Sequence, residues 1–347
     1  MTLGAVAQAT GYTIATVSMA LRNLPQVNAK TRQTIQETAT AMGYVPDPEL
    51  SRLMFKLREQ KKPRDTAALG YITAVDPHIR SSNPHMKIGY RVLKATAEAR
   101  GFVLEELFLP DYENQPGRML KICQHRGIRG LIFSGIEPGR VLPHLELDGF
   151  SLATTGRTVP FPIHRACQDQ YADTMVLLQE LNQLGYRRLG MILPHSSDLR
   201  VNSLFSAAFR VYLSQQPEGN RIEPLLCEEV TPALLVDWVR RVQPDGIVFH
   251  APPTAIMQGW LADAGFRVPE AFALAALDLP PNEPDSTGMV QNNGAVAEAT
   301  VDLVVNQIIR NQSGYPKTPR VVLIEGCFQR GKMAPQRVHG AMAPPPN

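Results

Sequence analysis

The feature that most constrains the fold is a repeated alternation of short apolar runs with helical stretches between residues 66 and 334. One set of runs begins with LGYIT at 69–73, and a second set begins with RLGMIL at 188–193. Short apolar runs fit buried strands, and the longer stretches between them have helical spacing. Strands that alternate with crossover helices form parallel sheets covered on both faces. The pattern therefore predicts two α/β lobes.

The expected elements of the two lobes follow this alternation along the chain. The expected strands cover residues 69–73, 102–109, 130–136, 151–156, 188–193, 223–229, 246–251, 272–278 and 287–293. The expected helices cover residues 91–101, 119–127, 172–185, 203–213, 234–242, 255–265 and 295–312. Ligands of open α/β sheets bind beyond the carboxyl ends of the strands, and two lobes form a cleft there. A small-molecule site between the lobes is therefore expected.

Residues 1–46 have a different pattern, which predicts three short helices. Thr13 is placed to cap the second helix and Asn28 the third, while Gly11 allows a tight first turn and Pro25 ends the second helix. A helix, a short turn and a second helix with small polar residues at its exposed start are typical of a helix-turn-helix DNA-binding unit. The alternative is a three-helix bundle that binds nothing, with Thr and Ser as caps.

The charge distribution favours nucleic acid as a partner of this end of the chain. Residues 1–65 hold nine Lys and Arg against five Asp and Glu, whereas residues 66–347 hold 26 against 27. A basic module on a near-neutral body is typical of phosphate contact, although a solvated charged surface gives the same balance.

The N-terminal sequence resembles a known family over more than fifty residues. The matching elements are the opening T-L-x-x-V-A, T-V-S-x-A-L in the second helix, V-x-x-K-T-R at the third and G-Y-V-P at the exit. In this fixed order they resemble the N-terminal module of the lactose-repressor family of bacterial transcription regulators. The resemblance implies that the second helix enters the major groove of an operator.

The resemblance also assigns DNA contacts by position. Ile14, Ala15 and Met19 fall where the family contacts bases, and Thr16 and Ser18 fall where it contacts phosphates. Some members have an arginine at the position of Met19, so direct readout here is expected to use apolar contact, for instance with a thymine methyl group. The complete set of expected DNA contacts is Thr13, Ile14, Ala15, Thr16, Ser18, Met19, Arg22, Asn28 and Leu53.

Residues 47–65 are expected to form a hinge helix and linker. Asp47 and Pro48 fit the cap and first helical positions, and apolar residues follow at helical spacing. The resemblance implies that this segment folds on DNA against its dimer mate and inserts Leu53 into a minor-groove step. Alternatively, Leu53 packs in a seam between two helices. The basic run KLREQKKPR is longer than the usual connection in the family.

The resemblance continues more loosely through residues 66–334, for example in GIRGLIFSG and DAGFRVPEAFALAALD. These segments look like the effector-binding core of the same family, which is similar to periplasmic sugar-binding proteins. The implied fold is an all-α helix-turn-helix domain followed by an α/β two-lobed periplasmic-binding-protein-like domain. The chain is expected to cross between the lobes near residues 164–168 and again near 290.

Five residues are expected to contact the effector. Asp278 and Asp169 match family aspartates, although Asp at a strand end is also common in turns and caps. Phe205 stands where the family usually has a ligand-clamping arginine, so the sugar assignment rests on other residues. Arg200, or else the nearby Asn202, is placed to reach the cleft instead. His250 ends a strand at the level of the cleft, where a structural histidine is the alternative.

Other classes of protein are disfavoured by what the sequence lacks. It contains none of the common nucleophile, phosphate-loop, dinucleotide or zinc-protease motifs. Its four cysteines and eight histidines are scattered, and the stretch with His78 and His85 is interpreted as a loop. No cofactor or metal is therefore expected. The chain shows neither an export signal nor a long apolar run, which favours a cytoplasmic protein with no membrane contact.

We therefore expect a dimeric transcriptional regulator, most simply a repressor, controlled by a small-molecule effector for which a carbohydrate is one candidate class. The expected domains are 1–46 for DNA binding, 47–65 for the hinge, 66–334 for effector binding and dimerisation, and 335–347 as a disordered tail. The absence of C-terminal leucine heptads favours a homodimer over a tetramer. The alternatives are a small-molecule sensor that does not recognise an operator, and an α/β enzyme.

Overall fold

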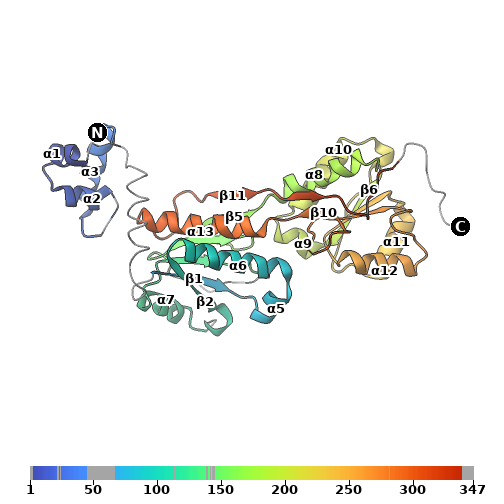
Figure 1. The fold of residues 1–347 in the computed structure, drawn as a ribbon, viewed down its shortest axis with the longest axis horizontal. Helices are drawn as coiled ribbons and strands as arrows, with labels where there is room; N and C mark the ends of the chain where they lie inside the picture. The colour runs from blue at the N-terminus through green and yellow to red at the C-terminus, as the bar shows by residue number, and fades with distance from the viewer. Residues whose placement is uncertain are drawn as a thin grey trace.

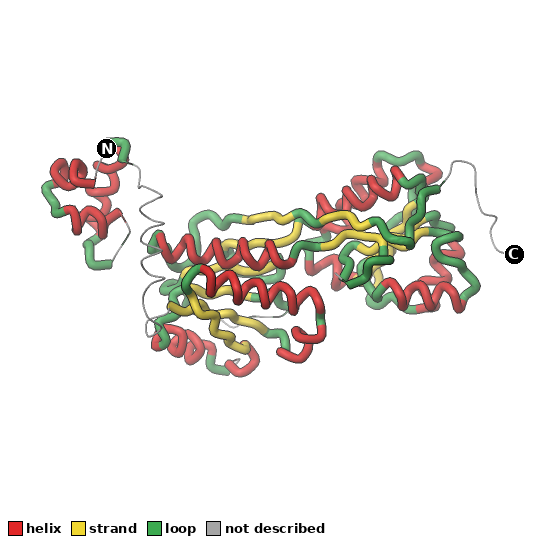
Figure 2. Tube along the Cα trace, viewed as in Figure 1, coloured by secondary structure: helices red, strands yellow, loops and turns green. Residues whose placement is uncertain are grey.

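The computed structural model describes residues 3–21, 23, 25–44, 67–112, 114–137, 140, 142, 145–280 and 282–337. These residues form a small helical unit and two α/β lobes that lie end to end (Figure 1). In each lobe the strands form a central layer with helices beside it (Figure 2). The predicted fold class, a helical N-terminal unit followed by two lobes with parallel sheets, is confirmed.

The helical unit consists of α1 (Leu3–Thr10), α2 (Ile14–Leu21) and α3 (Ala29–Ala41). Thr13 caps α2, because its hydroxyl accepts a hydrogen bond of 3.1 Å from the N–H of Thr16. Asn28 caps α3 in the same way, through a 2.8 Å bond from the N–H of Thr31. Val6, Val17 and Ile35, one from each helix, are fully buried and form the centre of a small core. The helices expected here are therefore present.

The first lobe is built on a parallel six-stranded sheet in the order β11-β5-β4-β3-β1-β2. Helices α6 and α13 pack together over one face of this sheet, and α7 belongs to the core on the other face. Its strands are β1 (Ala67–Thr73), β2 (Phe102–Phe108), β3 (Gly130–Phe133), β4 (Ser151–Thr155), β5 (His164–Gln168) and β11 (Val321–Ile324), and its helices are α5 (Pro77–Ser82), α6 (Pro84–Ala99), α7 (Pro116–His125) and α13 (Asn293–Ile309).

The second lobe has a six-stranded sheet in the order β12-β10-β9-β8-β6-β7, in which β12 alone runs antiparallel to its neighbour. Helices α8 and α10 pack over one face, and α11 and α12 over the other. Its strands are β6 (Leu189–Pro194), β7 (Leu225–Cys227), β8 (Gly246–Phe249), β9 (Ala273–Ala276), β10 (Thr287–Val290) and β12 (Cys327–Gln329), and its helices are α8 (Gln170–Gln183), α9 (His195–Arg200), α10 (Leu204–Ser214), α11 (Pro232–Val242) and α12 (Thr254–Asp263).

The chain passes between the lobes at three places rather than two. It crosses from β5 to α8, returns from β10 to α13, and crosses again from β11 to β12. The first two crossings lie where the sequence predicted them. The third was missed because β11 and β12 are short and only partly buried, so they lack the apolar run of a central strand.

Two further predictions need correction. The stretch with His78 and His85 was interpreted as a loop, but it forms α5 and the start of α6, which are capped by Asp76 and Asn83 and have proline in their first turns. The expected disordered tail begins with ordered residues, because the N–H of Arg337 donates to the carbonyl of Leu184 (2.8 Å). Within the described residues, no helix is long and apolar enough to cross a membrane.

Candidate functional site

The start of α2 presents the first candidate surface. Thr13, Ile14 and Ala15 are exposed, and Ile14 leaves 57% of its surface accessible, which is unusual for a large apolar side chain. Tyr12, which precedes the helix and is 39% exposed, extends this surface and was not predicted from the sequence. Exposed apolar side chains on one side of a short helix are available to contact another molecule.

The other predicted DNA contacts are less accessible in this unit. Thr16 and Ser18 are half-buried, and Met19 is half-buried against the core of the three helices. The hydroxyls of Thr13 and Thr16 lie 2.9 Å apart, and the side chain of Asn28 is occupied as a helix cap. Arg22 and Leu53 lie outside the described residues, as do the predicted hinge and both of its boundaries.

The second candidate is a cleft between the lobes with a cavity of about 430 Å³. Its first-lobe wall comes from α5, α6, α13 and the ends of β1, β3 and β4, and its second-lobe wall comes from α9, α10 and the ends of β8 and β9. Four of the five predicted effector residues, namely Arg200, Phe205, His250 and Asp278, line it. The topology explains this, because parallel strands bring their carboxyl ends to one edge of the sheet.

Asp169 does not lie in this lining. Its carboxylate accepts a hydrogen bond from the N–H of Ala172 (3.1 Å) and so caps α8, while its own N–H bonds to the carbonyl of Ile324 (2.9 Å). The cap role that is common for Asp thus accounts for this residue, and the expectation of effector contact is corrected. Its neighbour Gln170 lines the cleft instead.

Asp278 and His250 follow adjacent strands and hold buried polar atoms with no partner. Phe249 of β8 pairs with Ala276 of β9, so the two side chains emerge close together at the sheet edge. Among the described residues, neither Oδ1 of Asp278 nor Nδ1 of His250 has a hydrogen-bond partner. An unsatisfied buried polar atom costs about 1–3 kcal/mol, so such atoms are rare in a folded protein. A bound molecule with hydroxyl groups would satisfy both.

Burial also shifts the protonation of these groups toward neutral forms. Burial, and secondarily the charge of Asp173, raises the pKa of Asp278 to about 7. Burial, with a smaller effect of Arg200 and His85, lowers the pKa of His250 to about 4. At neutral pH the imidazole of His250 is therefore uncharged, and Asp278 is divided between its two forms.

His85 of the first lobe faces Asp278 across the cleft. Its Nδ1 lies 3.5 Å from Oδ1 of Asp278 and 3.2 Å from Nδ2 of Asn293. Burial lowers the pKa of His85, so the imidazole is neutral at neutral pH and the 3.5 Å contact is not an ion pair. This contact is not a hydrogen bond either, so Oδ1 of Asp278 can still form a hydrogen bond with a ligand.

Phe205 gives the cleft an aromatic floor on the second lobe. Its ring is 1% exposed and lies 5.6 Å from the ring of His250. The start of α10 is fixed by buried Asp198, whose carboxylate accepts bonds from the N–H and the hydroxyl of Ser206 (3.1 and 2.6 Å). On the first lobe, the rings of Tyr71 and Tyr90 form a second tilted pair at 5.5 Å. The cleft thus combines aromatic surface with hydrogen-bonding groups, as ligand sites commonly do.

The three crossings are joined behind the cleft by buried side chains. With its carboxamide oriented to match its neighbours, Gln168 donates to the carbonyl of Ile324 (3.0 Å) and accepts from the N–H of Asn292 (2.9 Å). Asp173 accepts from the N–H of Gly326 (2.8 Å), and a Cβ on Gly326 would lie 2.9 Å from the carbonyl oxygen of Val290. These contacts link all three crossings, so a change in the angle between the lobes must alter them together.

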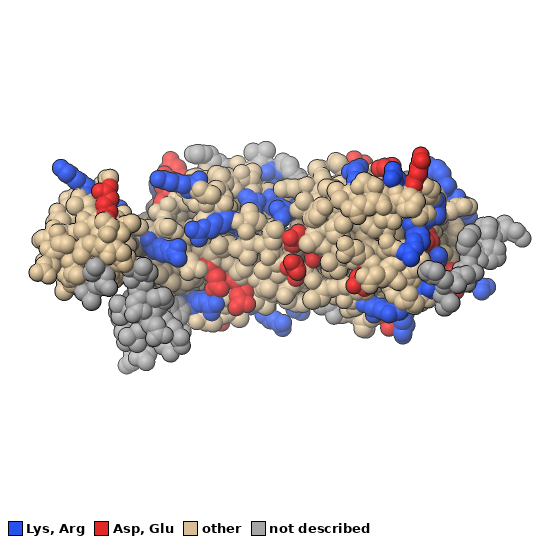
Figure 3. All heavy atoms as spheres, turned by 90° about the horizontal axis from the view of Figure 1, so that it is seen from above, with Lys and Arg blue, Asp and Glu red and all other residues tan. Residues whose placement is uncertain are grey.

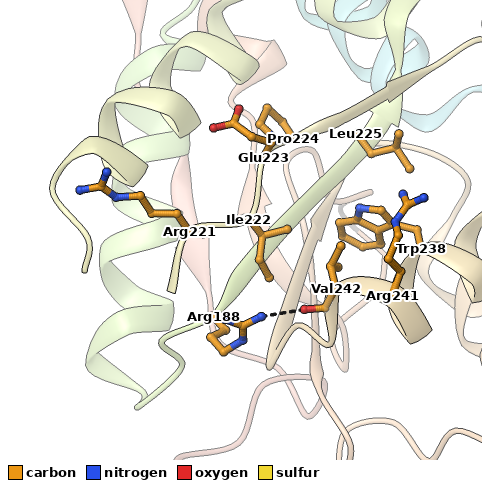
Figure 4. A pocket seen from close by; sticks show the side chains of 9 residues that line it. All are labelled: Arg188, Arg221, Ile222, Glu223, Pro224, Leu225, Trp238, Arg241 and Val242. Atoms are coloured by element: carbon orange, nitrogen blue, oxygen red, sulfur yellow. Dashed lines mark hydrogen bonds between the residues drawn. The ribbon is translucent and has the colours of Figure 1, made fainter. Parts of the chain in front are cut away.

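A second cavity, of about 440 Å³, lies at the amino ends of β6 and β7 (Figure 4). Arg188 donates there to the carbonyls of Val242 (2.8 Å), Gln243 (3.4 Å) and Gly219, and Arg221 donates to the carbonyl of Gln216 (2.8 Å). These guanidinium groups donate hydrogen bonds to carbonyl groups around the ends of α10 and α11, where helical carbonyls lack partners within the helix. Arg188 and Arg221 therefore have a structural explanation.

The described residues include no group of three or more His, Cys, Asp or Glu side chains that could hold a metal ion. On the face shown in Figure 3, basic and acidic side chains are scattered over both lobes. This agrees with the near-neutral charge of residues 66–347.

Comparison with protein families matches two parts of the chain. Residues 2–47 match the family described as bacterial regulatory proteins, lacI family, and residues 178–331 match the periplasmic binding protein-like domain. The HTH-type transcriptional regulator RafR of Escherichia coli is 25% identical over 261 residues, which cover 74% of this chain and 72% of RafR.

Solved structures share the fold over most of the chain. The lac repressor dimer bound to operator and the anti-inducer ONPF has a TM-score of 0.58 at 15% identity, covering 96% of this chain and 99% of that one. A complex of the transcriptional regulator CelR with cellobiose has a TM-score of 0.57 at 16% identity, with the same coverage. A LacI family regulator from Enterococcus faecium with bound ribose has a TM-score of 0.55 at 15% identity, covering 78% of this chain and all of that one.

Proposed function

This chain belongs to the lacI family of bacterial regulatory proteins, and we propose that it is a dimeric repressor whose grip on a near-palindromic operator is controlled by a carbohydrate bound between its lobes. The coarser function follows from the family. The chain is a DNA-binding transcriptional regulator with an effector-binding domain, and not an enzyme. The proposal adds the repressor role, the dimer, the operator and the effector.

The observation that carries the effector proposal is the pair of unpartnered polar atoms in the cleft. Oδ1 of Asp278 and Nδ1 of His250 lie on adjacent strand ends beside the ring of Phe205. Neighbouring hydroxyl groups on a ring could form hydrogen bonds with both atoms while the apolar face of the ring lies on aromatic carbon. The relatives with bound cellobiose and ribose show that this fold can hold such molecules.

On the DNA side we propose that the exposed start of α2 contacts base edges. Ile14 and Ala15 are the exposed apolar side chains there, and Thr13 and Thr16 offer hydroxyl groups to phosphates. Met19 is half-buried against the core of the three helices, and we propose that its exposed part makes a further apolar contact with the DNA. Thymine methyl groups are the base features that apolar side chains contact, so we expect thymines in each half-site.

Control of DNA binding requires that effector and operator prefer different arrangements of the lobes. Each ligand then changes the affinity of the other by the same factor, and a coupling of about 1–3 kcal/mol gives a change of about 5- to 150-fold. The contacts of Gln168 and Asp173 with the other crossings are suited to this task, because they belong to the segments that must rotate.

Selection from a random duplex pool tests the operator proposal directly. The purified protein, at about 150 mM salt to weaken non-specific phosphate contacts, should enrich a near-palindrome with thymines in each half-site. Ile14→Ala should reduce affinity for that sequence more than affinity for random duplex. An equal loss on both, or the absence of any enriched sequence with and without a metabolite extract, would contradict operator recognition by α2.

A further inference from the structure

Each of the two arginines that line the cleft is already paired with a glutamate. Arg80 of α5 makes a two-pronged contact with Glu106 of β2, with N–O distances of 2.6 and 2.8 Å. Its guanidinium also lies over the ring of Tyr90, 4.1 Å from the centroid. The two side chains of the pair are only 12% and 24% exposed, so solvent screens the contact little. Arg80 can still donate single hydrogen bonds, but it offers a ligand no net positive charge.

The second arginine is paired across the mouth of the cleft. Nη2 of Arg200, on α9 of the second lobe, lies 3.0 Å from Oε1 of Glu137, which follows β3 of the first lobe. Both side chains are more exposed than the buried pair, at 37% and 70%, so this contact is weaker. Arg157 does not line the cavity. Its Nε lies 3.4 Å from Oε1 of Gln170, which does line it.

The remaining titratable groups of the lining add no positive charge. His85 and His250 are neutral at neutral pH, and Asp278 contributes up to one negative charge. A phosphate or carboxylate in the cleft would therefore lose its hydration without gaining a cation, and it would face the carboxyl group of Asp278. Uncharged hydroxyl groups avoid this cost because they can donate to Asp278 and form a hydrogen bond of either direction with His250.

We propose that the effector is uncharged, and that Glu106, with a smaller contribution from Glu137, excludes anionic ligands by neutralising the arginines of the cleft. This inference rests on the proposal that the cleft is the effector site, and it specifies the class of ligand. Neutral saccharides and glycosides satisfy it, whereas sugar phosphates and sugar acids do not. Glu106 is then a specificity-determining residue that need not touch the ligand.

Inorganic phosphate is the probe for this test, because it requires no knowledge of the effector. Thermal unfolding is followed at constant ionic strength as phosphate replaces chloride. Wild-type protein should show no phosphate-specific change in Tm. Glu106→Gln removes the negative partner of Arg80, and it should gain an upward shift of about 2–4 °C relative to its own phosphate-free Tm.

The neighbouring residue provides a matched control. Glu105 lies on the same strand and pairs with Arg126 at 2.7 Å, outside the cleft lining, so Glu105→Gln should gain nothing. The double variant with Arg80→Gln and Glu106→Gln should lose the gain. If Glu106→Gln folds poorly, Glu137→Gln frees the exposed Arg200 and should show a smaller shift in the same direction.

Three results would overturn the inference. These are a phosphate-specific shift in the wild type, no gain in either glutamate variant, and a gain that persists without Arg80. Operator binding is measured separately in the absence of ligand, so that a failure of charge selectivity can be told apart from a failure of operator recognition. A protein that selects no operator but shows the expected phosphate behaviour would refute the proposed function while leaving the charge selectivity of the cleft intact.

Discussion

The two cavities have similar volumes, about 430 and 440 Å³, but they differ in what their polar groups do. In the cavity at the amino ends of β6 and β7, Arg188 is bonded to the carbonyl of Val242 (Figure 4), and Arg221 is bonded to the carbonyl of Gln216. In the interlobe cleft, Asp278 and His250 each hold a buried atom with no partner in the described part of the chain. Volume therefore does not distinguish the two, whereas unsatisfied polar atoms do.

The difference follows from the position of each cavity on the sheet. The interlobe cleft lies at the carboxyl ends of the strands, where successive loops bring side chains from different segments together. The other cavity lies at the opposite edge of the second sheet, beside the ends of α10 and α11, whose terminal carbonyls need donors. The first cavity is thus suited to a ligand, and the second to the stability of its lobe.

The largest expected effect is on ligand binding in the cleft. Asp278→Ala removes an acceptor of hydroxyl groups, so the affinity for the best-binding neutral saccharide of a screening panel should fall by about 10- to 100-fold. Calorimetric titration measures this loss. Affinity for operator without saccharide should remain within about twofold of wild type. Unchanged saccharide affinity would mean that Asp278 is not a ligand contact.

Arg188→Met tests the structural role of the other cavity. It removes three hydrogen bonds to carbonyl groups, two of them at the end of α11, and should lower the free energy of unfolding by about 1–2 kcal/mol. Denaturant titration gives that value, and saccharide affinity should not change. A variant that kept its stability but lost saccharide or operator affinity would reverse the roles assigned to the two cavities.

The raised pKa of Asp278 should make saccharide binding depend on pH. Hydroxyl groups donate to the ionised carboxylate, and Asp278 ionises in the free protein with a pKa of about 7. Affinity should therefore increase between about pH 6 and pH 8, by at most about tenfold, with release of a proton. Titration in buffers of different ionisation enthalpy measures that proton. Asp278→Asn should abolish the dependence, and a dependence that persists would assign it to another group.

The same raised pKa should make the stability of the ligand-free protein fall as pH rises, whereas saccharide affinity should rise. The folded pKa lies above the unfolded value, so stability is lost as pH rises from about 4 through 7. Asp278→Asn should therefore be more stable than wild type at about pH 8, and this advantage should shrink toward about pH 5. An advantage that does not change with pH would arise from packing rather than ionisation.

The smallest effect is expected at Arg241, which lines the second cavity and whose side chain makes no hydrogen bond or ion pair within the described residues. Arg241→Gln should change the free energy of unfolding by no more than about 0.5 kcal/mol and should leave saccharide affinity unchanged. It serves as the control for Arg188→Met, because both remove one positive charge from the same cavity. A large loss of ligand affinity would identify this cavity as a binding site after all.

The two-lobed fold was predictable from periodicity, and part of the site followed from topology. Asp278 and His250 directly follow apolar strands, so their place at the cleft could be inferred from the rule for carboxyl ends. Phe205 and Arg200 were also placed correctly in the lining. Asp169 was not, because a strand-end aspartate that caps the next helix has the same local sequence as one that faces a ligand.

The first-lobe wall of the cleft could not be predicted from the local sequence. His85 follows Asn83-Pro84, a cap and first-turn pair that marks a helix start, but the surrounding Ser and Pro residues suggested a loop. Arg80 and Glu106 are 26 residues apart, and their pairing depends on how the fold places α5 relative to β2. Contacts of this kind arise from tertiary packing and leave no trace in periodicity or spacing.

The most direct test of the cleft as the controlling site is operator affinity with and without a neutral saccharide that binds the wild type. Fluorescence anisotropy on the selected operator should show a change of about 5-fold or more for the wild type at saturating saccharide. Asp278→Asn, at the same saccharide concentration, should bind operator as the ligand-free wild type does. An equal response in both proteins would contradict control through the interlobe cleft.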